Sequence, residues 1–227
     1  MEDGKVMNKL NILYEDNHII VVEKEANILS QSDITKDIDL LTMVKKYIKE
    51  KYNKPGNVYV GLVHRLDRPV GGIMVFAKTS KAASRLSKQI KEKKFTKEYL
   101  AVINGLLKDD KATFVDYLKK IDNGNTIVTN KNEGKLSELS YEVIEKNIKE
   151  KKTLVKIKLK TGRHHQIRVQ FASRNYPLCG DQRYGNSDKT QIALYAYRLS
   201  FEHPTTHEIL NFELVPKQKG YWSLFTV

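Results

Sequence analysis

The sequence predicts an α/β-mixed (α+β) fold in which helices flank a largely antiparallel sheet. Most apolar runs are short and rich in β-branched or aromatic residues, and turn-forming residues separate them. A few segments instead repeat apolar residues at helical spacing. The length of 227 residues, of which 40% are apolar, suits one substantial core. We therefore expect a single domain over residues 1–227.

The N-terminal region is predicted to form a hairpin and then a helix. Residues 12–14 and 19–22 are β-prone and flank the polar cluster 15–18, which is typical of a strand-turn-strand unit. After Asp39, apolar residues recur at the spacing of one helix face until Pro55 breaks the pattern.

Two strands and a second helix are predicted next. Residues 58–63 and 73–77 are apolar and strand-like, so the polar, glycine-bearing segment 64–72 is predicted to be a loop between them. Thr79 or Ser80 can cap the following amphipathic helix, because either hydroxyl can accept a hydrogen bond from the first helical turn.

The rest of the chain is predicted to be mainly β. Five segments have strand composition, at residues 99–103, 114–118, 139–144, 194–201 and 209–214. Residues 155–159 alternate apolar side chains with lysines, as in a half-buried strand. Residues 164–174 have a helical pattern, which ends before Pro177.

The composition favours a polyanionic partner and a reducing compartment. The formal net charge is +13, which attracts nucleic acid first and an anionic membrane second, although many lysines can simply face solvent. The single cysteine, Cys179, supports neither an intramolecular disulfide nor a cysteine zinc site. No apolar run is long enough to cross a membrane, so we expect a cytoplasmic protein without a membrane partner.

Several enzyme classes are excluded by missing motifs. The chain has no phosphate-binding glycine loop and no nucleophile-elbow serine. Residues 64–67 resemble a kinase catalytic loop, but the aspartate falls one place late. His164 and His165 are adjacent, so they would not share a face of a helix or strand, and no other ligand spacing surrounds them. We therefore expect no metal and no cofactor.

One loop aspartate remains as a candidate for chemistry. Asp67 has Arg65 and Arg68 as near neighbours, and a guanidinium favours the ionised form of a carboxylate. A surface ion pair would have the same local sequence. The loop alone therefore does not decide between the two interpretations.

Four motifs in a fixed order favour the catalytic interpretation. They are HRLD at 64–67, K-x-Y-x-A at 97–101, TGRxHQIR at 161–168 and GDxxYG at 180–185. In this order the sequence resembles the RluA-type RNA pseudouridine synthases over most of its length. The resemblance implies the pseudouridine synthase fold, RNA as partner, and conversion of uridine in rRNA or tRNA to pseudouridine without a cofactor.

The resemblance also implies roles for individual residues. Asp67 matches the catalytic aspartate, Tyr99 the aromatic ring that stacks on the target uracil, and Arg168 the guanidinium that pairs with Asp67. Ile167 matches an apolar wall of the base pocket, and Arg65 the residue that approaches the gap left by the extruded base.

Three further residues of the TGRxHQIR motif are expected to contact substrate, namely Arg163, His165 and Gln166. Simpler interpretations remain open at this point. Tyr99 and Ile167 could be ordinary core residues, and the arginines could contact only phosphates. A protein that binds RNA without catalysis is the alternative function.

Two departures from the family pattern are visible. Val70 and Gly71 stand where most members have a pair of hydroxyl residues, which affects the shape of the loop and the choice of substrate. The family pattern already begins at Ile12, which leaves no room for the separate N-terminal RNA-binding domain of many relatives. We expect a monomer.

Overall fold

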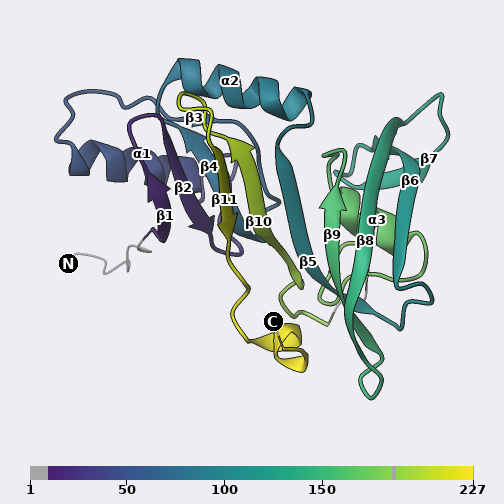
Figure 1. The fold of residues 1–227 in the computed structure, drawn as a ribbon. Helices are drawn as coiled ribbons and strands as arrows, with labels where there is room; N and C mark the ends of the chain where they lie inside the picture. Colours follow the sequence, from purple (N-terminus) through teal and green to yellow (C-terminus); the bar gives the residue numbers. More distant parts are fainter. Residues whose placement is uncertain (1–9, 186–187, 227) are drawn as a thin grey trace.

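The computed structural model describes residues 10–185 and 188–226, which build one eleven-stranded sheet with helices on both faces (Figure 1). The strand order is β1-β2-β4-β10-β5-β9-β8-β6-β7, with β11 paired to β10 and β3 paired to β4. Within this sheet only β4 and β10 run parallel, and all other paired strands are antiparallel. The predicted fold class is confirmed.

The strands alternate with three α-helices along the chain. The strands are β1 (Ile12–Glu15), β2 (Ile19–Lys24), β3 (Gly61–Leu62), β4 (Gly71–Ala77), β5 (Thr96–Asn104), β6 (Lys111–Lys120), β7 (Thr126–Thr129), β8 (Lys135–Asn147), β9 (Lys152–Leu159), β10 (Leu194–Glu202) and β11 (Ile209–Glu213). The helices are α1 (Leu40–Lys51), α2 (Ser80–Lys91), α3 (Gln166–Ala172) and the 3-10 helix η1 (Gly220–Leu224). None of these described helices is long and apolar enough to span a membrane.

Side-chain caps fix the starts of the two longer helices. The carboxylate of Asp39 accepts a hydrogen bond from the backbone N–H of Thr42 at 2.9 Å, which begins α1 where the sequence predicts it. The hydroxyl of Thr79 accepts from the N–H of Ala82 at 3.1 Å, so Thr79 is the cap of α2.

One predicted strand is much shorter than expected, and two short elements were missed. The strand predicted over 58–63 is reduced to the two residues of β3, because β3 shares one edge of β4 with β10. β10 pairs with the first two residues of β4, and β3 pairs with the last two residues of β4. The missed elements are β7, a four-residue strand that pairs with β6 at the edge of the sheet, and the 3-10 helix η1. Both are too short to leave a periodic sequence signal.

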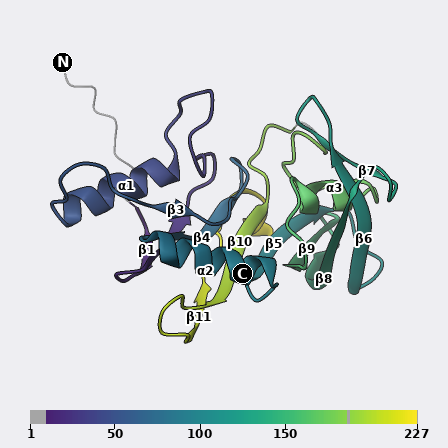
Figure 2. The ribbon, with the colours of Figure 1, turned by 90° about the horizontal axis from the view of Figure 1, so that it is seen from above.

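Period-two alternation along the strands builds a separate core on each face of the sheet. Ile20 and Val22 of β2 face the core formed with α1 and α3, whereas Ile19 and Val21 face the core under α2. Figure 2 shows α2 on the opposite side of the sheet from α1 and α3. The face that carries α1 and α3 is the one that holds the candidate site.

The departure from the family pattern at Val70 and Gly71 has a packing reason. Val70 is buried in the core beside α1. A Cβ at Gly71 would lie 3.0 Å from the ring of Tyr195, so this ring occupies the space of a side chain. The Tyr195 hydroxyl in turn donates a hydrogen bond to Glu23 at 2.8 Å. Apolar packing and an aromatic ring thus replace the hydroxyl pair.

A buried lysine ties β2 to the loop that precedes β4. The side chain of Lys24 is fully buried, and its ammonium donates to the carbonyls of Glu25, Ile28 and Arg68 at 3.1, 2.6 and 3.0 Å. Burial lowers the pKa of Lys24 to about 7, and the negative charge of Asp67 acts in the opposite direction. Three carbonyl acceptors match the three N–H bonds of the ammonium form.

We predict that Lys24→Met destabilises the protein, because three partly buried carbonyls lose their donor. The free energy of unfolding should fall by about 1–3 kcal/mol, the typical cost of leaving such acceptors without a partner. Urea denaturation checks this, with Lys45→Met on the exposed face of α1 as control. A loss as small as the control's, within about 0.5 kcal/mol, would contradict a structural role for the ammonium.

Candidate active site

A cavity of about 490 Å³ opens between the loop before β4 and the turn before α3, on the α1/α3 face of the sheet. Its volume lies within the range of pockets that hold small ligands. All eight residues named as candidates by the sequence line this one cavity: Arg65, Asp67, Tyr99, Arg163, His165, Gln166, Ile167 and Arg168. Segments about 100 residues apart in the chain therefore converge as expected.

Asp67 lies in a tight turn at the floor of the cavity. Its backbone carbonyl accepts a hydrogen bond from Val70 N–H at 3.0 Å, and its side chain is 27% exposed. One carboxylate oxygen, Oδ2, is 3.4 Å from Nη1 of Arg168 and 3.6 Å from Nε2 of His165. The carboxylate is thus held from one side by cationic or N–H groups while it stays accessible to a ligand.

The predicted pairing of Arg168 with Asp67 is present, but Arg168 has a closer partner. Its Nε and Nη2 donate to the two carboxylate oxygens of Asp181 at 2.9 and 2.7 Å, in a bidentate pair. The Asp181 side chain is fully buried, and the N–H groups of Arg183 and Tyr184 donate to it. Nη1 of Arg168 is left to face Asp67.

Sequence reasoning missed Asp181, although it quoted the motif that contains it. Burial alone would raise the pKa of Asp181, but the hydrogen bonds and charge of Arg168 outweigh burial and leave that pKa below its ordinary value. Asp181 is therefore ionised and neutralises the guanidinium. The motif at 180–185 also carries glutamine and arginine, so it gives no local sign that the carboxylate of Asp181 is buried against Arg168.

His165 is neutral, and its Nε2 faces Asp67. It adopts a left-handed conformation with φ of 52° and precedes α3. Burial, offset only in part by the charge of Asp67, lowers the pKa of His165 to about 4. The Tyr184 hydroxyl accepts from Thr126 N–H at 2.7 Å and lies 2.8 Å from His165 Nδ1. If the phenol donates its proton to Nδ1, the imidazole proton is on Nε2, which faces Asp67.

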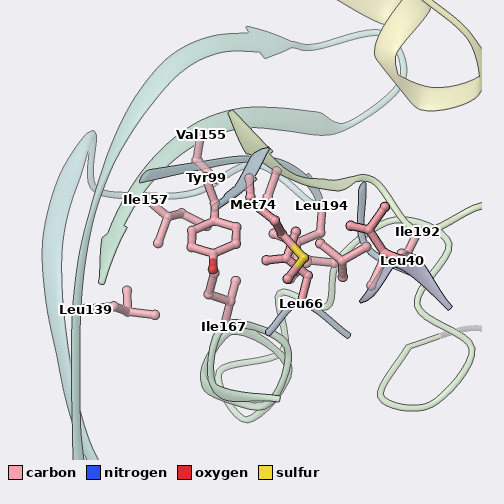
Figure 3. Close-up of a cluster of buried hydrophobic side chains, with 14 of the residues drawn as sticks. Leu40, Leu66, Met74, Tyr99, Leu139, Val155, Ile157, Ile167, Ile192 and Leu194 are labelled. Atoms are coloured by element: carbon pink, nitrogen blue, oxygen red, sulfur yellow. The ribbon is translucent and has the colours of Figure 1, made fainter. Parts of the chain in front are cut away.

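Tyr99 and Ile167 form the apolar wall of the cavity (Figure 3). Tyr99 lies opposite Ile157 in the β5–β9 pairing, and its ring points from β5 toward Ile167 on α3. The ring is buried, yet its hydroxyl makes no hydrogen bond to any described residue. Burial and the charge of Asp67 raise the pKa of Tyr99, so the phenol stays neutral.

The other three candidates differ in how freely they face the cavity. Arg65 is exposed, and no contact of its guanidinium with the described residues competes with a ligand. Arg163 is also exposed, and its Nε donates to the carbonyl of Leu136 at 3.1 Å. Gln166 is buried, and its amide is engaged inside the protein by Thr161, Arg163 and Glu138 at 2.9–3.1 Å. Gln166 therefore fixes the turn before α3.

The two adjacent histidines do not form a metal site with their neighbours. Among residues 10–185 and 188–226, no group of three His, Cys, Asp or Glu side chains could hold a metal ion. The rings of His164 and His165 nevertheless stack, with centroids 3.7 Å apart. Adjacent side chains point to different sides only within a regular helix or strand. Because His165 has a left-handed backbone conformation outside both, its ring can stack on that of His164.

We predict that Asp181→Asn destabilises the protein far more than Asp67→Asn. The first change leaves the Arg168 guanidinium buried without its bidentate partner, which costs about 3 kcal/mol in comparable cases. The second removes a longer contact to a partly exposed carboxylate, worth at most about 1 kcal/mol. Urea midpoints of both variants and of the double variant measure the difference.

The same pair predicts a pH dependence with a defined sign. Because the pKa of Asp181 is lower in the folded state, its stabilisation is present above the unfolded pKa of about 3.9 and is lost as the pH falls through the folded pKa. The stability gap between wild type and Asp181→Asn should therefore close on acidification below about pH 4. A gap that stays constant would show that the ionised pair is not the cause.

Comparisons with known proteins identify the family of the chain. Residues 18–173 match the family model described as RNA pseudouridylate synthase. The chain is 35% identical over 217 residues to an RNA pseudouridine synthase of Aquifex aeolicus, covering 90% of this chain and 69% of that protein. It is 32% identical over 222 residues to the ribosomal large subunit pseudouridine synthase C of Escherichia coli, covering 92% and 67% respectively.

A solved structure shares the fold. The structure of human RNA pseudouridylate synthase domain containing 4 superposes with a TM-score of 0.78 at 17% sequence identity, covering 94% of this chain and 90% of that one. The family match spans the segment that carries Asp67, Tyr99 and Arg168. The chain therefore belongs to the RNA pseudouridylate synthase family, isomerases that the four ordered motifs had indicated.

Proposed function

We propose that this RNA pseudouridine synthase modifies uridine in large-subunit ribosomal RNA and that Asp67 is its catalytic carboxylate. The observation that carries the assignment is the accessible carboxylate of Asp67, 3.4 Å from Arg168 at the floor of a cavity walled by Tyr99 and Ile167. The printed function of the Escherichia coli relative supports ribosomal RNA as the substrate. Transfer RNA is the alternative that the sequence left open.

The reaction needs little more than one carboxylate. Forming pseudouridine breaks the bond from the ribose to a ring nitrogen, turns the uracil and rejoins it through ring carbon five. The proton from that carbon moves to the freed ring nitrogen, so no electrons and no external group are exchanged. A positioned carboxylate can act as nucleophile or as proton acceptor in such a sequence.

The site has the parts needed to hold a base outside the helical stack. Extruding a nucleotide costs a few kcal/mol, which a stacking surface and backbone contacts can offset. Tyr99 and Ile167 would bound the uracil, and the exposed Arg65 lines the same cavity. The net charge of +13 would attract the RNA backbone without selecting a particular uridine.

A direct test measures tritium release from RNA labelled at carbon five of uracil. Ribosomal RNA and transfer RNA from a strain that lacks the gene serve as separate substrates, and pseudouridine mapping then locates the modified position. Release from the large-subunit rRNA alone is expected. Release from transfer RNA alone would refute the proposed substrate, and release from neither would refute the catalytic proposal.

We predict that Asp67→Asn abolishes isomerisation but keeps the fold and RNA binding. The change is nearly isosteric and removes only the ionised carboxylate, so no residual proton or nucleophilic chemistry is expected. Single-turnover tritium release, with circular dichroism and RNA affinity as controls, measures this. Turnover near the wild-type rate would show that another group does the chemistry.

Tyr99 variants separate stacking from proton chemistry. If the ring is chiefly a platform for uracil, Tyr99→Phe should keep most of the rate, while Tyr99→Ala should lose roughly 1–3 kcal/mol of base stacking. A phenol essential for proton transfer would instead make both variants slower by about 10² to 10⁴. We expect the first ordering, because the raised pKa of Tyr99 and the absence of a partner in the described structure do not favour proton exchange.

Single-turnover rates at saturating RNA are the measurement, so that differences in affinity do not appear as differences in chemistry. Ile157, which lies opposite Tyr99, offers a control for general loosening of the wall. Ile157→Val should change the rate much less than Tyr99→Ala. Similar failure of the Phe and Ala variants would exclude the platform role.

A further inference from the structure

A second cavity adjoins the catalytic cavity and shares part of its wall. It has a volume of about 350 Å³, and Ile90, Lys97, Leu159 and Gly162 line both cavities. It lies between the last turn of α2, the first part of β8 and the last residues of β9. The β5–β9 pairing begins beside it, at Glu98 and Lys158. An RNA strand that leaves the first cavity on this side would enter the second one.

The lining of the second cavity is strongly basic. Four lysines, Lys93, Lys97, Lys158 and Lys160, line it together with a single carboxylate, that of Glu138. Glu138 already pairs with Lys160 at 2.9 Å. All residues that line the cavity belong to the described part of the chain, and among them Lys93, Lys97 and Lys158 form no ion pair. The cavity therefore carries a positive charge that no carboxylate of its lining neutralises.

Lys97 is the lysine at the junction of the two cavities. It precedes Tyr99 by two residues on β5, so both side chains project from the same face, about 7 Å apart along the strand. The Lys97 side chain is half-buried and makes no hydrogen bond to the described protein. Burial lowers the pKa of Lys97 below its ordinary value. The nearby His64 is neutral, because burial and the charge of Lys97 lower its pKa to about 3.

An unpartnered, partly desolvated ammonium is unfavourable for the folded protein by itself. The same ammonium becomes favourable when an anion binds beside it, because a charge-assisted hydrogen bond forms in a shielded cavity. The hydroxyls of Thr96, Thr113 and Ser140 line the cavity and can donate to the same anion or bind a ribose. The lining thus fits a sugar-phosphate unit better than an apolar ligand.

We propose that this second cavity binds a backbone phosphate of the RNA next to the target nucleotide, with the ammonium of Lys97 as its anchor. The proposal rests on the proposed function, since it assumes that the base of the target lies against Tyr99. The spacing of Lys97 and Tyr99 along β5 is comparable with the length of one nucleotide. Lys93 and Lys158 would neutralise phosphates further along the strand.

The test compares RNA binding by Lys97→Met with binding by Lys108→Met, an equal loss of charge at an exposed lysine outside both cavities. The probe is a fluorescein-labelled oligouridylate, followed by anisotropy at several salt concentrations. We expect Lys97→Met to weaken binding about tenfold and to reduce the slope of log affinity against log salt by about 0.7. Lys108→Met should change neither, and Lys97→Arg should restore binding.

Thermal stability separates this role from a structural one. Removing an unpartnered ammonium should leave the melting temperature of Lys97→Met unchanged or raise it, whereas a structural lysine would lower it. The proposal is overturned if Lys97→Met binds like Lys108→Met, if wild type does not bind the oligouridylate, or if the lost binding accompanies a lowered melting temperature that Lys97→Arg does not restore.

Wild-type tritium release keeps the two proposals apart. If wild type releases tritium and Lys97→Met binds normally, the phosphate subsite alone is wrong. If wild type releases none and Lys97→Met still loses binding selectively, the phosphate subsite stands and the proposed function is wrong.

Discussion

The structure around the site depends on how the buried guanidinium of Arg168 is satisfied. A guanidinium at this depth must keep its donors paired, because an isolated buried charge costs far more than the fold can supply. Asp181 takes two donors and neutralises the charge. The remaining amino group, Nη1, is then free to approach the carboxylate of Asp67. The position of that carboxylate is therefore coupled to α3, which carries Arg168, and to the turn at 177–185, which carries Asp181.

Two buried basic side chains hold the Asp67 loop from the two halves of the sheet. Lys24, at the end of β2, holds the carbonyl of Arg68, and Arg168, on α3, holds the carboxylate of Asp67 itself. The first belongs to the strands near α1 and the second to the half covered by α3. The loop therefore bridges the two halves. A change in either half would alter the direction in which the carboxylate points without touching it.

The sequence predicted the parts of this arrangement that leave local patterns. Alternation and helical spacing identified most strands and helices, and the ordered motifs identified eight of the residues that line the cavity. Three features escaped prediction because they depend on contacts distant in the chain. The bidentate partner of Arg168 is Asp181, the hydroxyl of Tyr184 contacts Nδ1 of His165, and the strand at 58–63 is limited by β10. Each needs coordinates of a second segment, which spacing alone does not provide.

The face of the sheet that holds the candidate site also departs from the rule that buried polar groups find partners. The hydroxyl of Tyr99 and the ammonium of Lys97 lie on one face of β5, and neither has a hydrogen bond within the described chain. Beside them, Gln166 and Arg168 are each held by several hydrogen bonds. Polar groups left open beside groups held tightly are the ones free to form contacts with a ligand. Because Tyr99 and Lys97 share a strand face, a ligand that used both would extend from Asp67 past Tyr99 toward Lys97.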